Sequence, residues 1–280
     1  MAFLRVVEVF PPLFPGAAED DREVQLRRSI DDFVGDVNAI RGVADVVMVA
    51  SLKKPHFPAL STIEASLQLR RKLGLDAAPV IVVRDQDRLQ FLSSAVAGLV
   101  GGLKSMVLVW GDPGEARRSP KLIGFAGLSE ALSEATRISE RGRSRCRLFA
   151  PVDLRRLVTA RGVRIARERL SAGASFLLAQ PPATDSAETF DYQSKLVRAA
   201  GLEGKVLLSV FPFRSSRDVI ECERYFGWKL PKSLHAAAKE GESSLLQTQK
   251  EVVRRLRSEH FPGVYVSTRG NPAIAKEVLS

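Results

Sequence analysis

Glu8 is the residue whose position most strongly suggests chemistry. It lies inside an apolar run, VVEVFPP, at residues 6–12. In extended backbone Glu8 shares one face with Val6 and Phe10 and the other face carries two valines, so no alternation exposes the glutamate while burying its neighbours. A carboxylate in apolar surroundings needs a partner, or its pKa rises until the group is neutral. Such a carboxyl group is suited to donating a proton near neutral pH.

Asp112 and Gln180 are two further polar residues at the ends of apolar segments. Asp112 follows Leu108 and Trp110 on one face of its segment, and Gln180 ends the run FLLAQ. If these faces and that of Glu8 turn toward one interior, the three polar groups converge. Each residue alone could equally be a cap, a turn or half of a buried pair, but the three together favour a function.

The side-chain types narrow the chemistry. An aspartate can pair with a cation that develops on a ligand, and an amide can bind the edge of a heterocycle without adding charge. Gly111 would let a planar ligand approach the backbone closely. The sequence contains neither GxxxxGK[ST] nor GxGxxG after a strand. These residues therefore predict acid-assisted chemistry on a flat, neutral heterocycle.

The segments that must position these residues alternate between short apolar strands and amphipathic helices. Strands are expected at 5–10, 45–51, 79–85, 105–112, 145–151, 175–181, 205–212 and 263–269. Helices are expected near 22–41, 61–73, 87–100, 127–140, 157–172, 187–200, 216–227 and 243–259, with a final stub at 271–279. This order predicts an α/β protein with a single (β/α)8 TIM barrel, whose active site lies at the carboxyl ends of the strands. A doubly wound open sheet is the alternative.

No composition break or Pro/Gly linker divides the chain, so residues 1–280 are predicted to form one barrel domain. Two segments interrupt the alternation, a loop at 11–21 and a rim insertion at 228–242. The chain lacks a run of about 18 uncharged apolar residues and a signal-peptide pattern, so we expect no membrane association and a cytoplasmic location.

The cysteines and histidines give little reason to expect a metal site or a histidine-based triad. Cys146 and Cys222 stand far apart without a CxxC motif, and the three histidines are scattered. We read both cysteines as core residues and expect no metal.

A formal net charge of +10 raises the possibility of a nucleic-acid partner. Most of the basic residues come at helical spacing beside acids, and aromatic residues are not interleaved with them. Nucleic acid is therefore not the expected partner, although a basic RNA-binding protein stays open as an alternative. The segment Arg137–Arg147, which holds five arginines, could meet a polyanion or an anionic cofactor tail.

An ordered set of motifs covers nearly the whole chain and resembles the methylenetetrahydrofolate reductase family. That family has EFFPP with a catalytic glutamate on its first strand, RGD followed by proline on its fourth, DAGA before a sixth strand ending in TQ, and PGI-P on its seventh. The matching segments are EVFPP at 8–12, GLDAAPV at 74–80, WGDP at 110–113, SAGA at 171–174 with Gln180 after it, and SVFP at 209–212.

The resemblance implies a flavin-containing barrel that reduces methylenetetrahydrofolate to methyltetrahydrofolate. Glu8 would protonate the folate ring nitrogen so that the methylene bridge opens to an iminium, Asp112 would stabilise that cation, and Gln180 would orient folate or nicotinamide. FAD would be the cofactor, with NADH or another reductant, possibly an electron-donor protein, as the source of electrons. A homo-oligomer is also expected.

Other positions come from the same comparison. Four positions of the family's flavin pocket are replaced: Ala50-Ser51 stands for a Thr-Tyr, Val80 for a histidine, Trp110 for an arginine and Ala150-Pro151 for a Tyr-Pro. Two features are kept, because Ala126 matches an alanine of the family and Arg169 replaces a lysine without loss of charge. The predicted cofactor contacts are therefore Ala50, Ser51, Trp110, Gly111, Asp112, Ala126, Ala150 and Arg169. Folate contacts beyond Gln180 fall at Asp218 and at Arg269, which lies close to Asn271.

These replacements leave three explanations open. The protein could hold FAD differently, through the backbone of 109–112 and Arg169. It could work without flavin and pass hydride directly from a nicotinamide, with Trp110 stacking where the isoalloxazine would lie. It could also be a relative that acts on another pterin, or a non-catalytic pterin-binding paralogue.

Overall fold

The computed structural model describes residues 2–13, 22–51, 59–84, 86–111, 124–180, 184–227, 229–268 and 270–280. Two of the predicted site residues, Asp112 and Arg269, lie outside these ranges.

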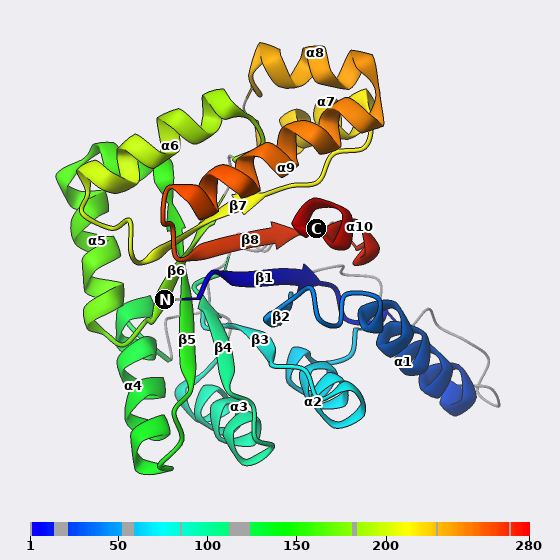
Figure 1. Cartoon of the computed structure of the whole chain (residues 1–280). Coiled ribbons are helices and arrows are strands. Elements are labelled where there is room, and N and C mark those ends of the chain that lie inside the picture. The colour runs from blue at the N-terminus through cyan, green and yellow to red at the C-terminus, as the bar shows by residue number, and fades with distance from the viewer. Residues whose placement is uncertain are drawn as a thin grey trace.

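Eight parallel strands form a closed barrel in which each strand pairs with the next and β8 pairs with β1 (Figure 1). The (β/α)8 barrel is therefore confirmed, and the open-sheet alternative is wrong. The strands are β1 (Leu4–Val9), β2 (Val46–Val49), β3 (Ala77–Val82), β4 (Ser105–Val109), β5 (Arg147–Asp153), β6 (Phe176–Gln180), β7 (Val206–Val210) and β8 (Gly263–Ser267).

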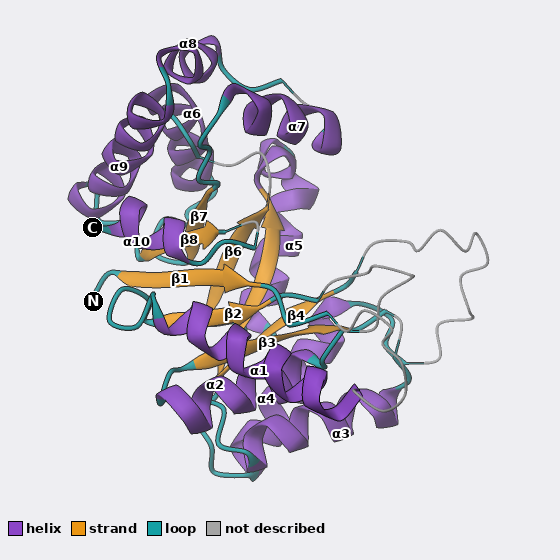
Figure 2. Ribbon diagram, turned by 90° about the vertical axis from the view of Figure 1, so that its right-hand side faces the viewer, coloured by secondary structure: helices purple, strands orange, loops and turns teal. Residues whose placement is uncertain are grey.

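Helices surround the barrel on the outside (Figure 2). They are α1 (Arg22–Asn38), α2 (Thr62–Leu73), α3 (Arg88–Val100), α4 (Leu128–Arg141), α5 (Ala160–Ser171), α6 (Ala187–Ala199), α7 (Ser216–Phe226), α8 (Lys232–Glu240), α9 (Glu242–Ser258) and α10 (Ala273–Leu279), with a 3-10 helix η2 (Leu154–Val158) between β5 and α5. In the described part of the chain no helix has the length and apolar character needed to cross a membrane.

The strands are apolar on both faces because both faces are buried. One face fills the barrel interior with residues such as Val6, Val107 and Phe149, and the other packs against the helices with residues such as Val7 and Leu108. Strands buried on both faces are typical of parallel sheets covered by helices. The two faces thus define which polar residues point into the barrel.

The predicted insertion at 228–242 contains α8. Together with α7 and the start of α9, α8 forms a separate small hydrophobic cluster that includes Phe213, Val219, Leu234 and Leu245. Figures 1 and 2 show α7 and α8 together, next to α9. The insertion therefore folds around its own apolar contacts rather than forming an extended loop.

Local signals set where the helices begin. The side chains of Ser61, Asp87, Thr159, Ser186 and Ser215 each accept a hydrogen bond from a backbone N–H in the first turn of the helix that follows. Such caps satisfy N–H groups that have no partner within the helix, and each contributes about 1 kcal/mol.

We expect Phe149→Ala to destabilise the barrel by about 3–5 kcal/mol, because Phe149 is fully buried in the interior and stacks on Phe176 at 6.1 Å between ring centroids. Urea unfolding at equilibrium measures the change. Val158→Ala is the matched control, since Val158 is 61% exposed and should alter the free energy of unfolding by less than about 0.5 kcal/mol. A similar small change for Phe149→Ala would contradict a tightly packed interior.

Candidate functional site

The carboxyl group of Glu8 lies inside the barrel near the carboxyl end of β1. It is on the same strand face as Val6, and the residue is only 9% exposed. On the neighbouring strand β8, the Tyr265 hydroxyl donates a hydrogen bond to Glu8 Oε2, and the Ser267 side chain also hydrogen-bonds to the carboxyl group. Thr268 Oγ1 donates to the Glu8 backbone carbonyl at 2.6 Å. The predicted inward position of Glu8 is thus confirmed.

Burial raises the pKa of Glu8, and the hydrogen bonds from Tyr265 and Ser267 offset part of that rise. Burial and the neighbouring Glu8 charge also raise the pKa of Tyr265 well above its ordinary value, so the tyrosine keeps its proton and remains a donor. Among the described residues no arginine, lysine or histidine forms an ion pair with Glu8. Burial thus shifts Glu8 toward its protonated form, and the two hydrogen-bond donors shift it back in part.

Two more polar side chains of the barrel interior lie near the same end. Ser209 of β7 pairs in register with Tyr265, is fully buried, and its Oγ has no hydrogen-bond partner among the described residues. Gln180 ends β6 on the face that carries Phe176 and Leu178, both of which pack in the interior. The inward direction predicted for that face of β6 is confirmed.

A cavity of about 370 Å³ opens at the carboxyl ends of β4, β5 and β6, against η2 and α5. Four of the predicted residues line it together: Trp110, Gly111, Arg169 and Gln180. Asp153 and Arg156, which the sequence did not single out, complete its polar lining. Asp153 is the register neighbour of Gln180 across β5 and β6. This cavity is of the size that binds a small ligand or one part of a larger cofactor.

Gly111 is required at the edge of this cavity. Its φ of +90° is in a region that side chains other than glycine rarely adopt, and a Cβ at this position would lie 2.5 Å from Val82 Cγ1. Its backbone conformation and the nearby Val82 therefore account for the glycine, which also lines the cavity.

Arg169 carries a positive charge that no carboxylate neutralises among the described residues. Its guanidinium donates to the Pro151 carbonyl, while Asp153 pairs with Arg155 at 3.0 Å and with Arg156 at 3.5 Å. Burial and the nearby charge of Arg156 lower the pKa of Arg169. Because Arg156 is already paired with Asp153, Arg169 supplies the charge at this end of the cavity that has no carboxylate partner among the described residues.

One predicted strand face is wrong. Leu108 and Trp110 pack with the outer layer between strands and helices, whereas Val107 and Val109 face the interior. The argument that placed Asp112 in the interior through that face therefore fails, and Asp112 itself lies outside the described residues. Trp110 still reaches the cavity from its half-buried position.

The remaining predicted residues do not line this cavity. Ala50 is buried directly after β2, and Ser51 is exposed. Ala150 is fully buried on the outer face of β5, and its neighbour Pro151 lines the cavity instead. Ala126 is exposed and donates its N–H to Glu130 at 2.8 Å.

Asp218 serves as a cap. Its carboxylate accepts hydrogen bonds from the backbone N–H groups of Arg214 and Ser215, both at 3.0 Å, at the start of α7. These hydrogen bonds account for an aspartate at position 218 without a bound ligand.

Asp185 is a buried acid that sequence reasoning missed. Its Oδ1 accepts from the Phe211 N–H at 2.7 Å, and Gln249 Nε2 donates to the Phe211 carbonyl at 3.2 Å. Burial raises the pKa of Asp185 well above its ordinary value. Because both side chains hold the backbone at the exit of β7, we read Asp185 as structural.

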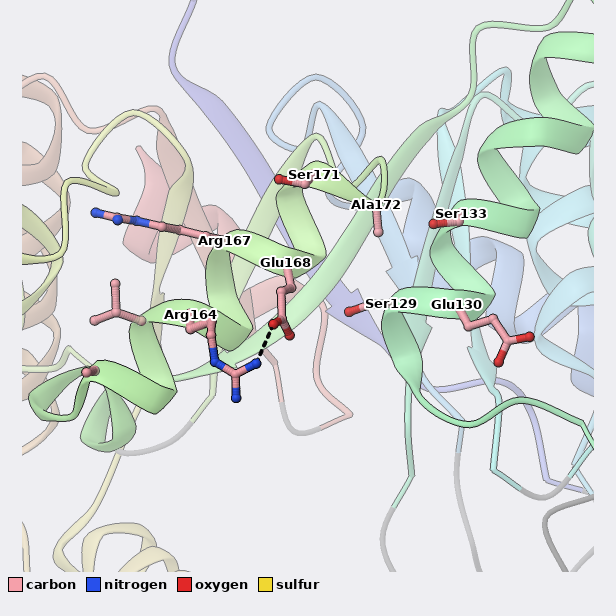
Figure 3. Close-up of a pocket in the computed structure, with 10 residues that line it drawn as sticks. Ser129, Glu130, Ser133, Arg164, Arg167, Glu168, Ser171 and Ala172 are labelled. Atoms are coloured by element: carbon pink, nitrogen blue, oxygen red, sulfur yellow. Dashed lines mark hydrogen bonds and ion pairs between the residues drawn. The ribbon is translucent and has the colours of Figure 1, made fainter.

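A larger groove of about 800 Å³ lies between α4 and α5 on the outside of the barrel (Figure 3). Its charged side chains already have partners: Arg164 pairs with Glu168 at 2.8 Å, and Arg167 donates to the Ala200 carbonyl at 2.9 Å. Glu130 accepts from Arg88 at 3.3 Å. The carbonyl does not neutralise the charge of Arg167, but the groove lies on the outside of the barrel and contains none of the predicted site residues.

Within the described residues, no three histidine, cysteine, aspartate or glutamate side chains are grouped so that they could hold a metal ion. Burial and the charge of Asp76 raise the pKa of the Cys146 thiol to about 12, so this cysteine is not a reactive thiolate.

Comparison with protein-family models and with curated proteins finds no match. Among solved structures, the HMG-CoA lyase of Bacillus subtilis is similar over 96% of this chain and 78% of its own, with 12% identity and a TM-score of 0.51. A 2,3-dimethylmalate lyase of the PEP mutase/isocitrate lyase superfamily covers 94% of this chain and 84% of its own (12% identity, TM-score 0.49). The deoxyribose phosphate aldolase of Aeropyrum pernix matches over 98% of this chain and 88% of its own (14% identity, TM-score 0.47). At these identities the similarity to the HMG-CoA lyase shows the barrel fold alone.

The buried Glu8 predicts a dependence of stability on pH. The pKa of Glu8 is higher in the folded than in the unfolded protein, so its carboxyl group contributes to the free energy of unfolding in the protonated form. This contribution is fully present below the unfolded-state pKa and is lost as pH rises through the folded-state pKa. Glu8→Gln should therefore unfold with a smaller loss of stability between acidic and mildly alkaline pH than the wild type. Urea titrations across this range measure it. The exposed Glu251→Gln on α9 should keep the wild-type slope, and an unchanged slope in Glu8→Gln would contradict the raised pKa.

Proposed function

We propose that this chain is a methylenetetrahydrofolate reductase-like oxidoreductase that converts methylenetetrahydrofolate, or a related pterin, to the methyl form. The observation that carries the proposal is a buried carboxyl group, Glu8, whose pKa is raised by burial and which Tyr265 holds near the carboxyl end of a (β/α)8 barrel. That end is where such barrels place their active sites. The similar HMG-CoA lyase is not named as a reductase, so the proposal rests on Glu8 and the ordered motifs rather than on the shared fold.

Glu8 would act as the general acid. Its raised pKa favours the protonated form of the carboxyl group, and transfer of that proton to the ring nitrogen would open the methylene bridge. The hydrogen bonds from Tyr265 and Ser267 favour the ionised carboxyl group, so they would stabilise the carboxylate that remains after transfer. The same two donors fix the orientation of the carboxyl group before the transfer.

Gln180 would connect the acid to the cavity. It lies on the inward face of β6 and also lines the 370 Å³ cavity beside Trp110 and Arg169. A neutral amide there can donate to and accept from a pterin edge without disturbing the charge balance around Glu8.

The cavity side chains fit a planar cofactor that carries phosphate. Arg156 and Arg169 would hold the anionic group, and Trp110 would pack against a flat ring. A flavin such as FAD, reduced by NADH or another electron donor, would supply the hydride when bound, and a nicotinamide dinucleotide bound directly is the alternative. A non-catalytic pterin-binding protein would use the same cavity and amide but would not need the protonated Glu8.

Glu8→Gln should lower the turnover of methylenetetrahydrofolate by about 10²–10⁴-fold while pterin binding persists, because the amide keeps the shape but has no acidic proton. Steady-state kinetics and a fluorescence binding titration separate the two effects. Tyr265→Phe, which keeps the acid, is the control and should retain measurable turnover. Undiminished turnover in Glu8→Gln would remove the proton-donor role.

Arg169→Gln should weaken cofactor binding roughly ten- to a hundredfold, since one charge-assisted contact contributes about 1.5–3 kcal/mol. The visible absorption of added FAD and the fluorescence of added NADH and NADPH measure binding. Arg164→Gln on the same helix, whose partner is Glu168, should bind as the wild type does. A wild-type protein that binds neither FAD nor a nicotinamide dinucleotide would remove the cofactor assignment.

A further inference from the structure

Ser209 is a buried polar residue that neither the fold nor the chemistry of Glu8 explains. It lies on β7, it is fully buried, and its Oγ has no hydrogen-bond partner among the described residues. A buried hydroxyl without a partner costs stability, because it has given up its hydrogen bonds to water. Such a group indicates either a function or a partner that comes from outside the fold.

The other buried serines show that Ser209 is an exception. Ser105 is equally buried on β4, and its Oγ donates to Asp76 Oδ2 at 2.9 Å. The remaining buried serines of the described chain also have hydrogen-bonded side chains: Ser66, Ser139, Ser186, Ser194 and Ser267. Within the described ranges, Ser209 is therefore the buried serine whose hydroxyl is left to bind something else.

Ser209 belongs to a row of inward polar side chains that crosses four consecutive strands, from β6 to β1. Leu207, two residues earlier on the same face of β7, packs in the barrel interior, so Ser209 also faces inward. Ser209 pairs in register with Tyr265 on β8, which donates to Glu8 on β1. On the other side, the register of β6 with β7, continued by two residues, places Gln180 beside Ser209. The hydroxyl thus lies between the acid and the amide of the candidate site.

We propose that Ser209 is a substrate-binding residue whose hydroxyl hydrogen-bonds to a polar ring atom of the ligand, between Glu8 and Gln180. In this role, which rests on the proposed function, the ligand is the pterin. A serine hydroxyl can donate and accept, and like the Gln180 amide it brings no charge near Glu8. The row therefore suits the uncharged polar edge of a flat heterocycle.

The two neighbours of Ser209 determine how a ligand reaches it. Tyr265 is 5% exposed and is held by Glu8, whereas Gln180 is half-buried and its amide makes no hydrogen bond among the described residues. Gln180 also lines the cavity of about 370 Å³. A ligand in that cavity that binds the amide would draw the Gln180 side chain aside and open the way to Ser209.

Ser209→Ala separates a ligand-binding hydroxyl from a structural one. The free energy of unfolding should stay the same or rise, because alanine removes a buried polar atom that has no partner in the described fold. Binding of methyltetrahydrofolate should weaken about three- to tenfold, which is the loss expected for one uncharged hydrogen bond. Urea unfolding and isothermal titration calorimetry measure the two effects.

Ser105→Ala is the matched control. Ser105 is as buried as Ser209, but its hydroxyl is bonded to Asp76 and it begins β4, at the opposite end of the barrel. This variant should lose stability and should bind methyltetrahydrofolate as the wild type does.

A lower free energy of unfolding in Ser209→Ala would contradict the proposal, because the fold, or a water trapped in it, would then already satisfy the hydroxyl. Unchanged binding in Ser209→Ala would overturn it too, while turnover by the wild type would still support the reductase function. A wild type that binds methyltetrahydrofolate but reduces no methylenetetrahydrofolate would remove the reductase function and leave the role of Ser209 in place. A wild type that binds no pterin would remove both.

Discussion

The hydrogen bond from Tyr265 to Glu8 joins the last strand of the barrel to the first. It acts beside the parallel pairing of β8 with β1 and the bond from Thr268 to the Glu8 carbonyl, so three kinds of contact hold the closing seam. A buried carboxyl group without such donors would cost stability, and the burial of Glu8 is tolerated because Tyr265 and Ser267 hydrogen-bond to it. The side chain with the best geometry for acid chemistry is therefore also part of what closes the fold.

The barrel mouth holds two polar regions of different character. On the β8–β1 side burial raises the pKa of Glu8, and on the β4–β6 side Arg169 has no carboxylate partner among the described residues. Gln180, which is uncharged, lines the second region from the end of β6. No described arginine or lysine contributes to the shift in the pKa of Glu8, so a nearby positive charge does not offset the effect of burial.

Strand alternation predicted the position of Glu8 and Gln180 but failed for β4. In β1 and β6 the polar residue identifies the inward face, whereas β4 reads Ser-Met-Val-Leu-Val and is apolar on both faces. Nothing in such a run tells which face packs on helices, so Leu108 and Trp110 were assigned to the wrong side. Tyr265 was missed for a different reason, since its partner lies 257 residues away in the chain and only barrel closure brings them together. Asp153 and Arg156 were missed because β5 runs to Asp153, two residues beyond the predicted strand, and η2 follows it directly.

The positive charge of the chain is distributed in a way that sets Arg169 apart from the other basic residues at helix ends. Basic residues occupy the last turns of α2, α4, α6 and α9, where they complement the helix dipoles, and many also pair with acids. Arg169 is also in a last turn, but its side chain turns inward to the Pro151 carbonyl and keeps its charge for the cavity. The other basic residues of these last turns therefore serve their own helices, whereas the guanidinium of Arg169 also lines the cavity at the carboxyl ends of β4–β6.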